Sequence, residues 1–126
     1  MNEELVKEWA VKAEEDYLAV EELFKIHVRR FATIICFHSQ QCAEKYLKAL
    51  LIACNIEPPR THSLETLLDL IVSEVPELEQ YRDMLTDLTP YSVQYRYPGV
   101  VATRDDARYC ARIIQELRKV FQEILK

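Results

Sequence analysis

Three short stretches of the 126-residue sequence carry side chains that could bind an anion or move a proton. In the first, His38, Gln41 and Lys45 follow one another at steps of three and four. On a helix this spacing places them on one edge, where an imidazole, an amide and an ammonium could hold a phosphate or a base. The alternative is a satisfied core histidine beside a solvated Glu44–Lys48 ion pair, of a kind that helical surfaces commonly carry.

The second stretch is Arg60-Thr61-His62-Ser63. Ser63 is of the residue type that caps a helix N-terminus, and such a terminus offers unpaired N–H groups and the positive end of the helix dipole. Arg60 and His62 would complete an anion site there. Simple capping, with His62 packed on the loop, is the alternative, and the residues alone leave both open.

The third stretch is Tyr95-Arg96-Tyr97-Pro98. An arginine between two tyrosines offers a guanidinium fork for phosphate and rings for base stacking. The alternative is a structural corner whose tyrosines fill the end of the molecule. Three of the seven tyrosines lie within residues 91–97, and function concentrates in loops, which favours a working surface.

Other kinds of chemistry find no support in the sequence. Its one glycine, Gly99, leaves no Gly-rich phosphate loop, and the motifs of zinc proteases and serine hydrolases are missing. The cysteines form no C-x-x-C pair and lie in apolar helical patterns, which predicts buried, reduced thiols rather than metal ligands; they are Cys36, Cys42, Cys54 and Cys110. We therefore expect neither a metal nor a cofactor.

Helices are the elements that must position these side chains. Apolar residues recurring at steps of three and four predict long helices over 3–27 and 30–55, and shorter ones after Ser63 and over 77–89. A further helix follows Thr103, which with Asp106 resembles a capping box, and runs to Leu125. We predict an all-α fold, an up-and-down four-helix bundle with an additional short helix, forming one domain over residues 1–126.

Net charge and hydropathy indicate which partners and which compartment the protein can have. The net charge of −5 does not favour a general nucleic-acid coat, and we expect no DNA binding. The longest stretch without a charged residue, 31–43, is too short to span a bilayer, and the N-terminus lacks the pattern of a signal peptide. These features predict a cytoplasmic protein with no membrane partner.

Taken together in this order, the blocks 37–50, 61–64 and 95–98 resemble the HEPN family, the higher eukaryotes and prokaryotes nucleotide-binding domain, in its stand-alone prokaryotic type. The resemblance covers nearly the whole chain. It implies a helical bundle that usually forms a homodimer, and a minimal nucleotidyltransferase as partner in a toxin–antitoxin-like two-component system. It also implies a possible nucleotide or RNA ligand.

Many members of that family are metal-independent ribonucleases, whose motif is an arginine followed after four to six residues by a histidine. The arginine would stabilise phosphate charge and the histidine would act as general base on the ribose 2′-hydroxyl. In this sequence no arginine precedes a histidine at that spacing. Arg30 and His38 are the nearest pair, and about 12 Å of helical rise separates them.

Three functional hypotheses follow. The first is a nucleotide- or RNA-binding and interaction module that pairs with a minimal nucleotidyltransferase, with a groove lined by His38, Gln41, Lys45, His62, Tyr95, Arg96 and Tyr97. The second is a ribonuclease toxin with a non-standard site, for which the catalytic candidates are His38, His62 and Arg96. The third is a dimerising helical scaffold whose polar edge does nothing chemical.

Overall fold

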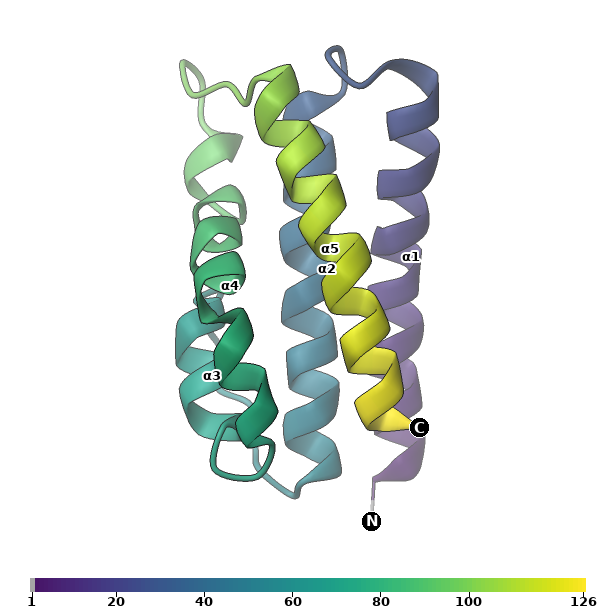
Figure 1. Ribbon diagram of the computed structural model, residues 1–126, viewed down its shortest axis with the longest axis vertical. Helices are drawn as coiled ribbons and strands as arrows, with labels where there is room; N and C mark the ends of the chain where they lie inside the picture. Colours follow the sequence, from purple (N-terminus) through teal and green to yellow (C-terminus); the bar gives the residue numbers. More distant parts are fainter. Residues whose placement is uncertain (1) are drawn as a thin grey trace.

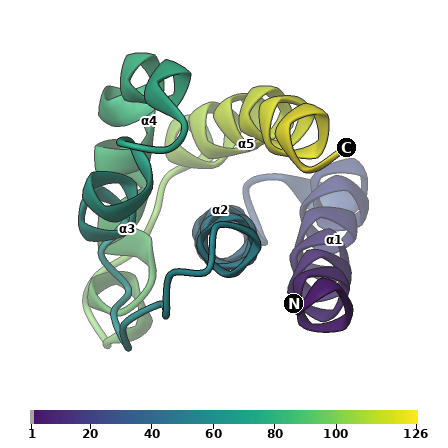
Figure 2. The same ribbon diagram turned by 90° about the horizontal axis from the view of Figure 1, so that it is seen from below.

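Helix α2 (Ala32–Ala53) is the central element of the structure, a computed structural model that describes residues 2–126. Viewed along its axis, α2 is flanked by α1, α5 and α3 (Figure 2). Most of its side chains are buried, including Ile35, Leu47 and Leu51. A helix that is apolar on most sides needs neighbours on most sides, so the wide apolar stripe of the sequence explains this central position.

Helix α1 (Glu3–His27) lies antiparallel to α2 after a short turn, as the sequence predicts (Figure 1). Its buried face contains Ala13, Tyr17 and Val20. Phe24 and His27 continue the same pattern of steps of three and four, but both are exposed. Helix α5 (Arg104–Leu125) crosses α2 at a tilt, so that its end lies near α1 while its start stands apart from it (Figures 1 and 2).

The C-terminus of α2 lies two residues before the predicted one, and backbone chemistry sets it. Asn55 adopts a left-handed φ of 60°. Its N–H donates to the Ile52 carbonyl over 2.9 Å, and the Ile56 N–H donates to the Leu51 carbonyl over 2.8 Å. This pair of bonds is the Schellman motif, which satisfies the last carbonyls of a helix. The chain therefore turns before Pro58 is reached.

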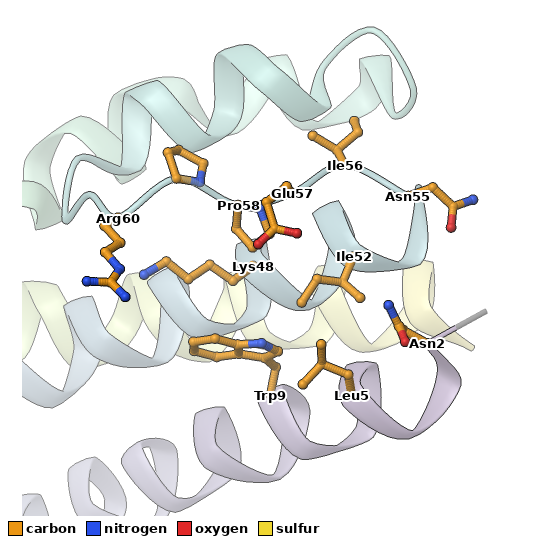
Figure 3. Close-up of a pocket in the computed structure, with 11 residues that line it drawn as sticks. Asn2, Leu5, Trp9, Lys48, Ile52, Asn55, Ile56, Glu57, Pro58 and Arg60 are labelled. Atoms are coloured by element: carbon orange, nitrogen blue, oxygen red, sulfur yellow. The ribbon is translucent and has the colours of Figure 1, made fainter.

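After this turn, residues 55–62 run back along α2 to its middle (Figure 3). Helix α3 (Leu64–Ile71) then starts at Ser63, whose hydroxyl accepts a hydrogen bond from the Thr66 N–H over 3.2 Å. The predicted N-cap is thus confirmed. Because this crossover, residues 55–62, returns along α2, it brings His62 beside the polar edge of that helix.

The predicted helix over 77–89 divides into two parts, a 3-10 helix (Pro76–Tyr81) and α4 (Arg82–Leu88). Two short 3-10 turns, Thr89–Tyr91 and Gln94–Arg96, lead towards α5. The predicted capping box is confirmed: the Asp106 N–H donates to the Thr103 hydroxyl over 3.0 Å, and the Thr103 N–H to the Asp106 carboxylate over 2.8 Å. Both reciprocal bonds of the motif are present.

The predicted all-α bundle is confirmed, with five α-helices and no strand within residues 2–126. No helix in this range has the length and apolar character needed to cross a membrane. Figure 1 shows the long helices side by side, with both termini at the same end.

Candidate functional site

Asp16 of α1 binds two of the predicted site residues of α2. Its side chain is only 8% exposed. Its Oδ1 lies 2.7 Å from His38 Nδ1, and its Oδ2 accepts a hydrogen bond from Lys45 Nζ, also over 2.7 Å. An ionised carboxylate can only accept hydrogen bonds, so Nδ1 of His38 carries a proton. In the neutral imidazole Nε2 is then an acceptor.

Glu44 of α2 forms a second cluster of the same kind. It is 4% exposed and accepts hydrogen bonds from Lys48 Nζ at 2.9 Å, His62 Nδ1 at 2.9 Å and Gln40 Nε2 at 3.1 Å. Burial raises the pKa of this carboxyl, but the three hydrogen bonds outweigh burial and leave the pKa below its usual value. The Glu44–Lys48 pair is therefore a buried anchor, and the expectation of a solvated ion pair is wrong.

Gln40 joins the crossover to α2. Besides its bond to Glu44, its amide nitrogen donates to the His62 carbonyl oxygen over 3.0 Å. Its own carbonyl oxygen accepts a hydrogen bond from Gln41 Nε2 over 2.7 Å. The amide of Gln41 therefore belongs to the same hydrogen-bond network as His62. This network fixes the position of the crossover along α2.

The tyrosine-rich stretch divides between structural and exposed roles. The rings of Tyr91 and Tyr95 lie 4.3 Å apart, and Tyr95 packs against the core. Tyr97 is 63% exposed. The guanidinium carbon of Arg96 lies 5.4 Å from the Phe37 ring centre, and this ring meets the His38 ring edge-on at 5.3 Å. Arg96 therefore contacts Phe37, and Phe37 in turn contacts His38 of the α2 edge.

The predicted site residues fall into three neighbouring groups. In the first, His38 and Lys45 both bind Asp16. In the second, His62 binds Glu44, and Gln41 joins the same network through Gln40. The third is the stretch Tyr95-Arg96-Tyr97, which meets the other two through Phe37. Within residues 2–126 no hydrogen bond or ion pair joins Arg96 to His38 or His62. The edge of α2 that carries these groups is called here the α2 edge, defined by His38, Gln41, Lys45, Lys48 and the adjoining His62.

Sequence reasoning missed the residues that hold this edge together. Asp16 lies 22 residues from His38 and 29 from Lys45 along the chain. One signal could have revealed it: Asp16 follows Ala13 by three positions and precedes Val20 by four, so a carboxylate stands on the buried face of α1. A charge at such a position needs a partner. Gln40 and Phe37 carried no comparable signal.

A cleft of about 560 Å³ adjoins the α2 edge, between α1 and the crossover (Figure 3). Trp9 lies on its α1 side and Arg60 on its crossover side. Lys48, which binds Glu44, also stands 5.5 Å from the Trp9 ring centre. The cleft therefore combines apolar walls with two cations next to the edge.

The α2 edge can offer hydrogen-bond donors, acceptors and modest positive charge. The two carboxylates that hold the edge, Asp16 and Glu44, are balanced by Lys45 and Lys48. The formal charge of the whole cluster is therefore zero with neutral histidines and rises when either imidazole is protonated. Each histidine uses Nδ1 internally. Nε2 is then the atom that a ligand can reach, either as a proton acceptor or, when protonated, as a donor to a phosphate.

The cysteines take no part in this site. All four are free thiols. The predicted burial is confirmed for Cys36, Cys42 and Cys110, whereas Cys54 is only half-buried. Burial raises the pKa of Cys42, and hydrogen bonding to Cys110 together with burial raises that of Cys36. Such thiols are unreactive. Among residues 2–126 no group of three or more histidine, cysteine or acidic side chains is arranged to hold a metal ion.

Comparison with known proteins gives a family model and two solved structures. The model of the HEPN domain matches residues 6–125. The crystal structure of TT1696 from Thermus thermophilus superimposes with a TM-score of 0.80 at 22% identity, covering 98% of each chain. The structure of ST0689, an archaeal HEPN homologue, gives a TM-score of 0.73 at 27% identity and covers 96% of this chain and 98% of that one. No curated protein matches the chain.

Proposed function

The chain belongs to the HEPN domain family, and from that premise we propose that it is a nucleotide- or RNA-binding interaction module that pairs with a minimal nucleotidyltransferase. The α2 edge is its ligand-binding surface. The pair works in the cytoplasm as a toxin–antitoxin-like two-component system, with the HEPN chain as a homodimer. Binding rather than RNA cleavage is the main role, because the arginine–histidine spacing of the family's ribonucleases does not occur in the sequence.

One observation carries this proposal: two almost fully buried carboxylates each hold a histidine and a lysine on the same side of α2. Burying a charge is costly unless it is paired. Asp16 and Glu44 satisfy this requirement and at the same time restrict the rotamers of the cations around them. Groups restricted before a ligand arrives lose less entropy on binding, which is why we assign the edge to ligand binding.

Lys45 provides the test of the ligand. Replacing Lys45 with Met keeps most of the stem and removes the ammonium, so the affinity for a labelled ribonucleotide should fall by about tenfold. Lys119→Met removes a charge from an exposed position on α5 and is the matched control. Equal affinities of the two variants, measured by fluorescence anisotropy, would remove Lys45 from the site.

Pairing is tested separately. The chain should be co-expressed with the minimal nucleotidyltransferase encoded nearest to it and passed over a size-exclusion column. We expect the two proteins to elute together, ahead of either alone, and we expect the HEPN chain alone to elute as a dimer. Separate elution at micromolar concentration would count against the partner without touching the ligand assignment.

A metal-independent ribonuclease is the second candidate, favoured by the Asp16–His38 contact. A carboxylate at Nδ1 orients an imidazole and leaves Nε2 to accept a proton from a ribose 2′-hydroxyl. Arg96, beyond the Phe37 ring, would have to move to reach the same phosphate. This candidate predicts fragments ending in 2′,3′-cyclic phosphate. His38→Ala should then lower cleavage by about 10²–10⁴-fold, and unchanged cleavage would reject the site.

A further inference from the structure

A second, strongly basic groove lies between α1 and α5, apart from the α2 edge. It consists of two adjoining hollows of about 470 and 310 Å³, which share Phe24, Lys25 and Arg108. Arg29 and Arg104 line the first hollow and Arg112 the second. We call these six residues the α1–α5 groove. It opens where the start of α5 stands apart from α1 (Figure 1).

The three arginines of α5 form a row along this groove. Arg104, Arg108 and Arg112 follow at intervals of four residues, so they lie one above another on one face of the helix. The row extends over about 12 Å of helical rise. On the α1 side, Lys25 lies in the last turn of α1 and Arg29 in the turn that follows the helix. A row of this length is longer than the binding of a single phosphate group requires.

Few negative charges neutralise the groove. Glu21 is the one carboxylate among the residues that line the two hollows. Lys25 approaches Glu22 at 3.4 Å, but both side chains are largely exposed and such pairs are weak. Across residues 2–126, Arg29, Arg104 and Arg108 take part in no ion pair. Five cations therefore gather in one hollowed surface of a chain whose net charge is −5.

Helix stability explains only half of this arrangement. Lys25 stands in the last turn of α1 and Arg29 just beyond its C-terminal end, where the helix dipole favours cations. Arg104 is the first residue of α5, where the dipole disfavours them. Asp105 and Asp106 suit that end of the helix, but Arg104 does not. The charge of Arg104 is therefore not stabilised by its own helix, and a bound anion would stabilise it.

We propose that the α1–α5 groove binds the phosphate backbone of a single-stranded nucleic acid. Spaced cations that track successive phosphates, together with an exposed aromatic ring on which a base can stack, are the features of such surfaces. The arginine row supplies the cations, and Phe24, 37% exposed at the centre of the groove, supplies the ring. The length of the row favours a strand over a free nucleotide. This inference deepens the proposed function, from which it takes only the class of ligand.

The test measures anisotropy of labelled oligouridylate and oligodeoxythymidylate at several salt concentrations. Arg104→Ala with Arg108→Ala is the groove variant, and Lys7→Ala with Lys119→Ala, two exposed lysines outside the groove, is the control that loses the same charge. We expect the groove variant to bind about tenfold more weakly or worse, and its salt slope to fall by about 1.4. The control should bind as the unmodified chain does. Oligouridylate and oligodeoxythymidylate separate RNA from DNA as the source of the strand.

Each other outcome is decisive as well. Equal binding by the groove variant and the control would overturn the proposal. It would also be overturned if inorganic tripolyphosphate or ATP displaced the labelled strand as effectively as unlabelled strands do. A third variant, His38→Ala with Lys45→Met, separates the two sites. If it loses nucleotide affinity while strand binding persists, both proposals hold. If only the groove variant loses binding, the groove stands and the α2 edge fails as a ligand site.

Discussion

Single buried carboxylates organise this molecule at the scale of the residue. Glu44, in the C-terminal half of α2, has three hydrogen-bonding partners, whereas Asp16 reaches the same helix from α1. Removing one partner of such a buried pair costs more than the pair itself contributes, because the remaining charge is left unpaired. These two residues therefore link stability to the geometry of the proposed site.

Glu44→Gln should lower the free energy of unfolding at pH 7 by about 3 kcal/mol, because Lys48 keeps its charge in a position that is only 12% exposed. Urea denaturation measures this loss. Glu15→Gln, in an exposed pair with Lys12, is the control and should change stability by less than about 0.5 kcal/mol. A similar small change for both variants would show that Glu44 is not an anchor.

The pH dependence of stability in acid should report on the same carboxylate, Glu44. The folded pKa of Glu44 lies below the usual value of 4.5, so the folded state binds fewer protons there than the unfolded state. Its contribution to stability is complete above about pH 4.5 and is lost as the pH falls through the folded pKa. Between pH 6 and pH 3, Glu44→Gln should therefore lose less stability than the unmodified chain. A parallel decline of both would contradict the assigned direction of the shift.

At the scale of the element, local sequence signals determine where helices begin more clearly than where they end. Ser63 and Thr103 could both be predicted as N-caps, since the polar side chain acts on its own helix within three residues. The sequence predicts the end of α2 two residues too late, because the left-handed conformation of Asn55 is rarer than that of a glycine and carries a weak signal. The extended crossover that follows depends on contacts with α2, so its path could not be predicted from the local sequence.

Thr103→Ala should destabilise the protein by about 1 kcal/mol, because it removes the oxygen that accepts the Asp106 N–H and breaks the capping box. Thermal unfolding followed by circular dichroism checks this. Thr86→Ala, at an exposed position inside α4, tests the same chemical change without a cap. Since alanine has the higher helix propensity, the control should be neutral or slightly stabilising, and equal losses would contradict the capping role.

At the scale of the whole molecule, α2 organises both the core and the surface. One side of this helix provides fully buried residues such as Leu47, and the opposite side provides the α2 edge. The bundle and the buried helix could be predicted from apolar periodicity alone. The pairing of His38 and Lys45 on Asp16 could not, because it depends on the register between α1 and α2. Likewise, the α1–α5 groove arises from the tilt of α5, which periodicity does not encode.

Leu47→Ala should cost about 3–5 kcal/mol, because it opens a cavity at the centre of the molecule where neighbouring helices cannot all close in. Leu18→Ala, at a position of α1 that is 56% exposed, removes the same atoms and should change stability by less than about 0.5 kcal/mol. Chemical denaturation of both variants compares them directly. A small cost at Leu47 would mean that α2 is not the central element.

Binding of a nucleotide or short RNA at the α2 edge can be followed directly through the three histidines of the chain. His38 and His62 stand on that edge, while His27 lines the α1–α5 groove. Imidazole ¹H–¹⁵N spectra should be recorded while a ribonucleotide is added. We predict saturable shifts of the Nε2 resonances of His38 and His62, whether or not His27 also responds. Saturation of binding with both of these resonances unmoved would show that the ligand does not bind at the α2 edge.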